Sequence, residues 1–174
     1  MVRARPESTV FFFDEGRFGL QPVVGKLWGR KGVRSTVVTQ TGYENFYMYS
    51  AVNPATGEDV SLFLPWANTA MMTIFLEAMQ EALGWRCCLL VLDQAGWHNS
   101  QDLRVPKNIE LVYQPAYSPE LNPVERLWRW LKRHSLRNQF HTTLESVMNT
   151  TRKCCQKTTR PFLMSLCRCR YLLN

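Results

Sequence analysis

Two apolar segments that each end in an aspartate constrain the fold of this chain more than any other feature. Residues 9–15 have the sequence TVFFFDE, and residues 87–93 have the sequence CCLLVLD. Both are short and nearly continuous apolar runs, which is typical of strands that are covered on both faces. A carboxylate at the end of such a strand lies at the rim of the sheet, where it is solvated, paired or bound to a cation. If the two predicted strands are neighbours, Asp14 and Asp93 lie close together.

The other segments predict further strands and helices around this pair. Residues 44–65 predict a hairpin with an NPATG turn, residues 68–84 a capped helix, and residues 108–115 another strand. Two more helices are predicted to begin near Pro123 and Thr142. Because the chain has 174 residues and is 45% hydrophobic, it suits one core and one domain. The order of elements indicates an α/β domain layered around a mixed sheet.

Basic residues are concentrated in the C-terminal part of the chain. The net charge is +7, and the residues after 125 carry 11 Lys or Arg against the single acid Glu145. A one-sided basic surplus is typical of proteins that bind nucleic acid, although solvated helix faces also account for it. A glycine-rich basic stretch at residues 16–34 is predicted to be a solvated loop or a contact to a phosphate backbone. The candidate DNA contacts are Lys26, Arg30, Lys31 and Arg34 in this stretch, and Arg129, Lys132 and Arg133 in a later helix.

The sequence predicts neither a membrane segment nor a disulfide framework. The longest apolar run, CCLLVL at residues 87–92, is too short to cross a bilayer, and the N-terminal residues lack a signal-peptide pattern. The six cysteines occur in adjacent or nearly adjacent pairs, which is not the layout of a secreted disulfide scaffold. They are predicted to be reduced thiols, and a zinc site among the last four lacks the usual ligand spacing. We expect a cytoplasmic protein, or a nuclear one in a eukaryote.

Glu125, in the segment SPELNPVERLW at residues 118–128, has two competing interpretations. Asn122 as a helix cap, Pro123 at the first helical position and Glu125 three residues after the cap form a capping box. Alternatively, Glu125 joins Asp14 and Asp93 at the sheet rim. Three converging carboxylates repel one another unless divalent cations neutralise them, and hard oxygen ligands suit Mg²⁺ or Mn²⁺. Two such ions about 3.5 to 4 Å apart promote phosphodiester chemistry. A Glu125 side chain folded back onto the Asn122 amide is incompatible with the metal site.

Three blocks of the sequence resemble the signature motifs of a known enzyme family. They are FFFDEGRFGLQP, LVLDQAGWHNS and QPAYSPELNPVERLWRWLK, which follow one another within residues 11–132. Together they resemble DDE transposases, specifically the bacterial insertion-sequence branch of the mariner superfamily. The resemblance implies a ribonuclease H-like α/β fold, with a mixed five-stranded sheet and helices on both faces. It also implies that Asp14, Asp93 and Glu125 are the catalytic residues and the ligands of Mg²⁺ or Mn²⁺, with two ions bound during catalysis.

The same resemblance implies a reaction and its partners. Water cleaves the DNA strand at the transposon ends, and a DNA 3′-hydroxyl then attacks target DNA, usually at a TA dinucleotide. A homodimer acting on DNA at the bacterial nucleoid is expected. Residues 1–174 are expected to form a single catalytic domain with a basic helical segment at about 140–174 and without the N-terminal helix-turn-helix domain usual in the family. The alternatives are a ribonuclease H-like nuclease of another specificity and an inactive DNA-binding remnant.

Three neighbours of the predicted triad are candidates for supporting roles. Glu15 is predicted to point to the opposite face of the sheet from Asp14, where it supports the site from behind. His98 is predicted to contact substrate or metal-bound water, or else to make a helix-start hydrogen bond. Asn122 belongs to the same group as a helix cap beside the site. Three other acids, Asp59, Asp102 and Glu120, are interpreted as surface residues.

Overall fold

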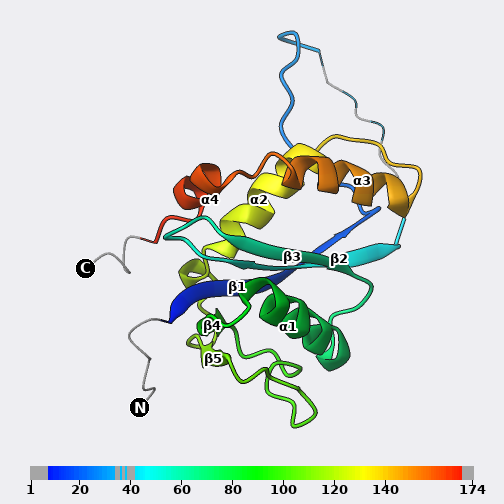
Figure 1. Cartoon of the computed structure of the whole chain (residues 1–174). Coiled ribbons are helices and arrows are strands. Elements are labelled where there is room, and N and C mark those ends of the chain that lie inside the picture. Colours follow the sequence, from blue (N-terminus) through cyan, green and yellow to red (C-terminus); the bar gives the residue numbers. More distant parts are fainter. Residues whose placement is uncertain (1–7, 34–35, 37, 39–41, 170–174) are drawn as a thin grey trace.

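A five-stranded mixed sheet forms the centre of the protein (Figure 1). The computed structural model describes residues 8–33, 36, 38 and 42–169. The strand order is β3-β2-β1-β4-β5, with β1, β2 and β3 antiparallel and with β4 parallel to both β1 and β5. This arrangement confirms the predicted mixed five-stranded sheet. The strands are β1 (Thr9–Gly19), β2 (Asn45–Val52), β3 (Asp59–Leu64), β4 (Cys88–Leu92) and β5 (Ile109–Tyr113).

Strand β1 is longer than its sequence predicted. We expected it to end before Gly16, but it continues to Gly19 because β2 pairs with it along residues 12–19. The aromatic rings of Phe18 and Phe46 stack across this pair, with centroids 5.8 Å apart. A glycine inside the strand is therefore tolerated where the partner strand and packed aromatic rings supply the stabilisation.

Helices cover both faces of the sheet, as predicted (Figure 1). Helix α1 (Thr69–Leu83) packs on one face, and α2 (Val124–Ser135), α3 (Leu144–Cys155) and α4 (Arg160–Leu166) lie on the other. Asn68 caps α1 as expected, because its Oδ1 accepts a hydrogen bond of 3.0 Å from the Met71 backbone N–H. A short 3₁₀ turn, η1 (Pro119–Leu121), precedes α2. No helix in the described part of the chain is both long and apolar enough to cross a membrane.

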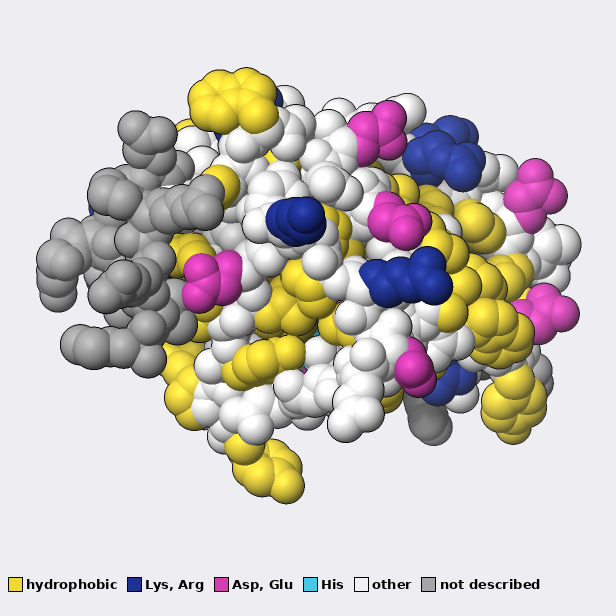
Figure 2. All heavy atoms as spheres, turned by 60° about the horizontal axis from the view of Figure 1, so that its bottom comes forward, with side chains coloured by type: hydrophobic (Ala, Val, Ile, Leu, Met, Phe, Trp, Pro, Cys, Tyr) yellow, Lys and Arg dark blue, Asp and Glu magenta, His cyan; other side chains and the backbone are white. Residues whose placement is uncertain are grey.

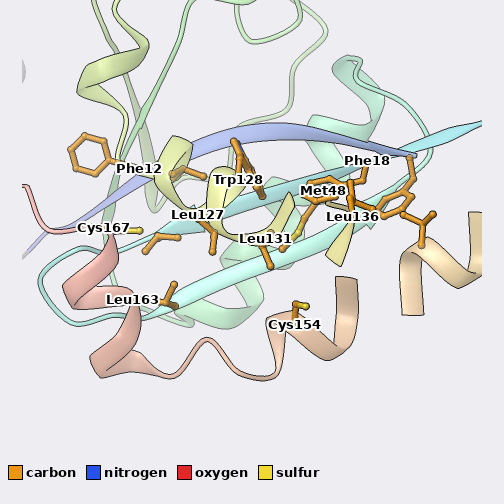
Figure 3. Close-up of a cluster of buried hydrophobic side chains, with 14 of the residues drawn as sticks. Phe12, Phe18, Met48, Leu127, Trp128, Leu131, Leu136, Cys154, Leu163 and Cys167 are labelled. Atoms are coloured by element: carbon orange, nitrogen blue, oxygen red, sulfur yellow. The ribbon is translucent and has the colours of Figure 1, made fainter. Parts of the chain in front are cut away.

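The core between α2 and the sheet fixes the position of that helix. Val124, Leu127, Trp128 and Leu131 recur at helical spacing and are at most 3% exposed. Figure 3 shows Leu127, Trp128 and Leu131 of α2 among side chains of β1, α3 and α4. The cysteines that belong to this cluster are free thiols, namely Cys154, Cys167 and Cys169.

The turn between β2 and β3 offers a test of how α4 packs. Gly57 and Gly84 have φ values of 67° and 62°, so both disfavour a side chain. A Cβ at position 57 would also collide with the Arg160 backbone carbonyl at the start of α4, whereas at position 84 nothing lies within 4 Å. We expect Gly84→Ala to lower the free energy of unfolding by about 1 to 3 kcal/mol. The collision at position 57 should make the loss in Gly57→Ala larger by about 1 to 3 kcal/mol. Urea denaturation measures both, and equal losses would contradict this packing.

Candidate active site

Asp14, Asp93 and Glu125 line one cavity of about 480 Å³. Asp14 lies within β1, Asp93 directly follows β4, and Glu125 is in the first turn of α2. In the parallel pairing of β1 with β4, Phe12 is opposite Val91. Asp14 and Asp93 each follow this last pair by two residues, so both lie at the same end of the β1–β4 pairing. The sheet register and α2 thus bring together three acids that lie far apart in the sequence.

The Asp14 carboxyl group is held by an aromatic N–H and resists ionisation. Trp128 on α2 donates its indole N–H to Asp14 Oδ2 at 2.8 Å. Burial raises the pKa of Asp14 from its ordinary 3.8 to about 7, and the charges of Glu15 and Glu125 act in the same direction. The Trp128 hydrogen bond opposes this rise. Asp14 and Glu125 also line the same cavity.

The surroundings of Asp93 favour its ionised form, in contrast to those of Asp14. Its Oδ1 accepts hydrogen bonds from the Ala95 backbone N–H at 3.1 Å and pairs with His98 Nδ1 at 2.8 Å. The His98 hydrogen bond is the main cause that lowers the pKa of Asp93. The side chain is 58% exposed, so Asp93 remains ionised and open to the cavity. The pKa of Asp14 is therefore raised and that of Asp93 lowered, so Asp93 loses its proton at a lower pH than Asp14.

His98 is a buried bridge between Asp93 and Glu15. Its side chain is 1% exposed, and its Nε2 lies 2.8 Å from Glu15 Oε1, which also accepts the Trp97 indole N–H at 2.8 Å. Burial disfavours the imidazolium, but hydrogen bonds to Asp93 and Glu15 outweigh it and raise the pKa of His98 to about 9. Glu15 packs on the α1 face of the sheet, in keeping with strand alternation. His98 begins no helix, so the predicted helix-start hydrogen bond is wrong, and a contact with substrate or metal-bound water stays a prediction.

The predicted capping box at Asn122 is wrong. The Asn122 backbone N–H donates to the Pro119 carbonyl of η1 at 3.0 Å, so it is not available to the Glu125 side chain. Asn122 Oδ1 instead accepts the Val124 N–H at 3.1 Å, and its Nδ2 donates to the Phe13 carbonyl at 2.7 Å. The half-buried Glu125 carboxylate makes no hydrogen bond to another residue of the described ranges and lines the cavity. The local alternative to a metal-binding role for Glu125 is thereby removed.

None of the candidate DNA contacts in the described ranges is among the residues that line the cavity. The loop after β1 projects from the body in Figure 1, and its base is fixed by the Arg137 guanidinium donating to the Lys26 carbonyl at 2.8 Å. On α2, the Lys132 ammonium lies 5.5 Å from the centre of the Phe18 ring. Arg34 falls outside the described residues. The exposed candidates are Lys26, Arg30, Lys31, Arg129 and Arg133.

Sequence reasoning missed several residues that shape the site. It assigned Trp128 only to the packing stripe, although its position three residues after Glu125 places both on neighbouring parts of one helix face. Gln114 lines the cavity at 6% exposure, and its amide nitrogen has no hydrogen-bond partner among the described residues. Tyr117 lies at the same cavity, fully exposed, with a φ of 57°. No residue-type pattern in the sequence signals the positions of Gln114 and Tyr117.

The three acids are of the residue type that binds hard divalent cations, although their carboxyl groups do not converge on a single position. Within the described ranges, no three His, Cys, Asp or Glu side chains are grouped so that they could hold a metal ion. The donor set nevertheless consists of carboxylates, which Mg²⁺ and Mn²⁺ prefer. Trp128 and His98 engage only one oxygen each, Oδ2 of Asp14 and Oδ1 of Asp93. A cation would relieve the repulsion that Glu125 exerts on Asp14.

Comparisons with known proteins find a matching family and two similar sequences. Residues 9–148 match the family described as DDE superfamily endonuclease. The uncharacterised protein y4pE/y4sA of Sinorhizobium fredii is 37% identical over 117 residues, which cover 63% of this chain and 79% of that protein. The uncharacterised 39 kDa protein of insertion element IS630 from Shigella sonnei is 27% identical over 154 residues, which cover 84% of this chain and 44% of that protein.

Solved structures of Mos1 complexes have a similar fold. The Mos1 strand transfer complex matches with a TM-score of 0.68 at 20% identity, over 92% of this chain and 51% of the Mos1 chain. The Mos1 paired-end complexes with Mn and with Mg match with TM-scores of 0.66 and 0.67 at 18% and 19% identity, over 91% of this chain and 51% of theirs. This likeness confirms the predicted ribonuclease H-like fold. The chain spans about half the length of the Mos1 chains.

Because the pKa of Asp14 is raised and that of Asp93 is lowered, replacing each with asparagine should change the free energy of unfolding in opposite directions. The measurement is made in EDTA, so that no divalent cation is bound. Between about pH 4 and 7 the folded protein keeps a proton on Asp14 that the unfolded chain releases, so the free energy of unfolding falls as the pH rises. Asp14→Asn removes this loss and should be more stable than wild type at about pH 8. The pKa of Asp93 is lower in the folded protein than its ordinary value of 3.8. Ionised Asp93 therefore stabilises the fold at every pH above 3.8, and this stabilisation is lost as the pH falls through the folded pKa. Asp93→Asn should therefore be less stable at about pH 8.

Urea denaturation across this pH range tests the pair. The stability gain of Asp14→Asn should shrink toward about pH 4. Changes of the same sign in both variants at about pH 8 would contradict the described environments.

Proposed function

Because the chain belongs to the DDE superfamily endonucleases, we propose that it is the catalytic domain of a transposase that cuts DNA strands and joins their ends to target DNA. The observation that carries this proposal is that Asp14, Asp93 and Glu125 line one cavity at the rim of a ribonuclease H-like sheet. Similarity to a protein of insertion element IS630 supports transposition as the biological context. The reaction class is polynucleotidyl transfer.

In this proposal, Asp14, Asp93 and Glu125 would hold Mg²⁺ or Mn²⁺, with two ions during catalysis. When bound, such cations lower the barrier to attack at phosphorus by activating the nucleophile and stabilising the leaving oxygen. The Mos1 complexes solved with Mn and with Mg, which share this fold, support the choice of metal. Carboxylates are suited to this task because they supply hard oxygen ligands and negative charge together.

The protein's own groups prepare the site before any cation arrives. The His98 imidazole keeps Asp93 ionised, and Glu15 holds the far side of that imidazole. Burial keeps Asp14 protonated up to about pH 7, so cation binding would displace a proton there. In each reaction step an oxygen nucleophile, water for cleavage and a DNA 3′-hydroxyl for transfer, forms one P–O bond while another breaks. No covalent bond between protein and DNA is required.

Basic groups near the site are proposed to hold the DNA backbone. The exposed ones are Lys26, Arg30 and Lys31 of the loop and Arg129 and Arg133 of α2. The half-buried Lys132 and Arg34, which falls outside the described residues, complete the proposed set. Figure 2, which brings the lower side of Figure 1 forward, shows acidic and basic side chains interspersed on that face. The concentration of basic residues after position 125 therefore favours a DNA path along the side that carries α2.

The finer features of the proposal come from the family resemblance and the relatives. They are a TA target dinucleotide, a homodimer on paired transposon ends, and action at the nucleoid in the bacterial cytoplasm. The Mos1 paired-end complex is an assembly of that protein with transposon ends, and it supports the proposal of paired ends for this chain.

Substitution of each acid tests the proposed triad. Asp14→Asn, Asp93→Asn and Glu125→Gln should each reduce Mg²⁺- or Mn²⁺-dependent nicking of supercoiled plasmid DNA by at least about 100-fold, since even the partners of metal ligands contribute 10 to 100-fold. Calorimetric titration with Mn²⁺ should show weakened binding in the same variants. Asp102→Asn, an exposed acid in a turn, is the matched control and should retain both properties.

Three outcomes would redirect the assignment. Full nicking activity in any triad variant would remove that residue from the proposed site. Preferential cleavage of RNA–DNA hybrids would indicate a ribonuclease H-like nuclease of another specificity. Absence of Mn²⁺ binding by the wild-type protein would indicate a DNA-binding remnant.

A further inference from the structure

Helix α2 is attached to β1 by two side-chain hydrogen bonds that flank Glu125. Asn122, three residues before Glu125, donates its Nδ2 to the Phe13 carbonyl at 2.7 Å. Trp128, three residues after Glu125, donates its indole N–H to Asp14 Oδ2 at 2.8 Å. The two acceptors are consecutive residues of β1. The segment that carries Glu125 is therefore fixed to the strand that carries Asp14 at one point on each side of Glu125.

The indole of Trp128 lies in a site that β1 itself builds. Asp14, Gly16 and Phe18 alternate onto the same face of the strand. A Cβ at position 16 would come within 2.9 Å of Trp128 Cδ2, so only a glycine leaves room for the ring. Phe18 packs edge-on against the indole, with centroids 5.9 Å apart at 76°. Trp128 is 3% exposed in this site, and Figure 3 shows it among the side chains that α2 buries against the sheet.

The acceptor that Trp128 uses distinguishes it from an ordinary core tryptophan. A buried indole N–H needs a partner, and any backbone carbonyl would satisfy it. Here the partner is one oxygen of a carboxylate that faces the cavity with Asp93 and Glu125. The bond fixes the rotation of the Asp14 carboxylate and leaves Oδ1 outside this contact. Partners of this kind around metal ligands orient the ligand and contribute to metal affinity.

We propose that Trp128 is a positioning residue of the active site, which orients the Asp14 carboxylate and sets its separation from Glu125. The same helix carries Trp128 and Glu125, so a shift of the indole moves both acids relative to each other. Gly16 contributes to this positioning, because the absence of a Cβ leaves room for the indole ring. This inference rests on the proposed function, in which the acids bind divalent cations.

Substitution of two tryptophans on α2 tests the proposal in the full chain. Trp128→Phe keeps an aromatic ring but removes the N–H donor. Trp130→Phe is the matched control, because Trp130 packs on Phe162 and His134, with centroids 4.9 Å and 4.5 Å away, and does not line the cavity. The dissociation constant for Mn²⁺, measured by calorimetry, should rise about 10 to 100-fold in Trp128→Phe and stay unchanged in Trp130→Phe. For plasmid nicking, kcat should fall in Trp128→Phe while KM for DNA stays constant.

A second substitution separates the hydrogen bond from packing. Incorporation of benzothienylalanine at position 128 replaces the indole N–H with sulfur at nearly constant shape, so the fold is preserved if Trp128→Phe unfolds. It should weaken Mn²⁺ binding as Trp128→Phe does.

The outcomes separate this inference from the proposed function. Mn²⁺ binding and kcat at the wild-type level in the benzothienylalanine protein would overturn the positioning role and leave the function intact. Failure of the wild-type protein to bind Mn²⁺ would overturn the proposed function, and the positioning role with it.

Discussion

The gathering of three carboxyl groups around one partly buried cavity is the constraint on which the rest of the structure depends. Such groups are costly in the same low-dielectric space unless each is protonated, paired or bound to a cation. The structure uses the first two solutions for the aspartates, since burial keeps Asp14 protonated up to about pH 7 and His98 pairs with Asp93. The Glu125 carboxyl group makes no hydrogen bond or ion pair with another residue of the described ranges. A hard divalent cation at these acids would offset the repulsion between their charges.

The fold supplies the proximity that this constraint requires. Parallel pairing of β1 with β4 aligns the ends of two apolar segments, and antiparallel pairing with β2 extends β1 beyond Asp14. Helix α2 then returns across the sheet and is tied to β1 on both sides of Glu125. Catalysis of phosphodiester chemistry by preorganised charge needs such rigid support, because misplacement of ligands by about 1 Å reduces rate strongly. The apolar core under α2 and the polar site at its N-terminus are thus parts of one structure.

The sequence alone predicted the elements of this fold better than their polar contacts. Apolar runs and turn residues located all five strands and the main helices, because those patterns reflect burial directly. The extension of β1 past Gly16 depends on its partner strand, and the loss of the capping box depends on η1 taking the Asn122 N–H. The roles of Trp128 and His98 depend on acids that lie 114 and 83 residues away along the chain. Such distant pairings leave no local periodicity for a sequence pattern to show.

A crystal structure of the protein grown with Mn²⁺, analysed by anomalous scattering, tests the central claim most directly. The account predicts manganese between Asp14, Asp93 and Glu125, with the Glu125 carboxylate drawn toward the two aspartates and the Trp128 to Asp14 hydrogen bond retained. A structure at saturating Mn²⁺ with no manganese at these acids, or with Glu125 turned away from an ion held by the aspartates alone, would contradict it.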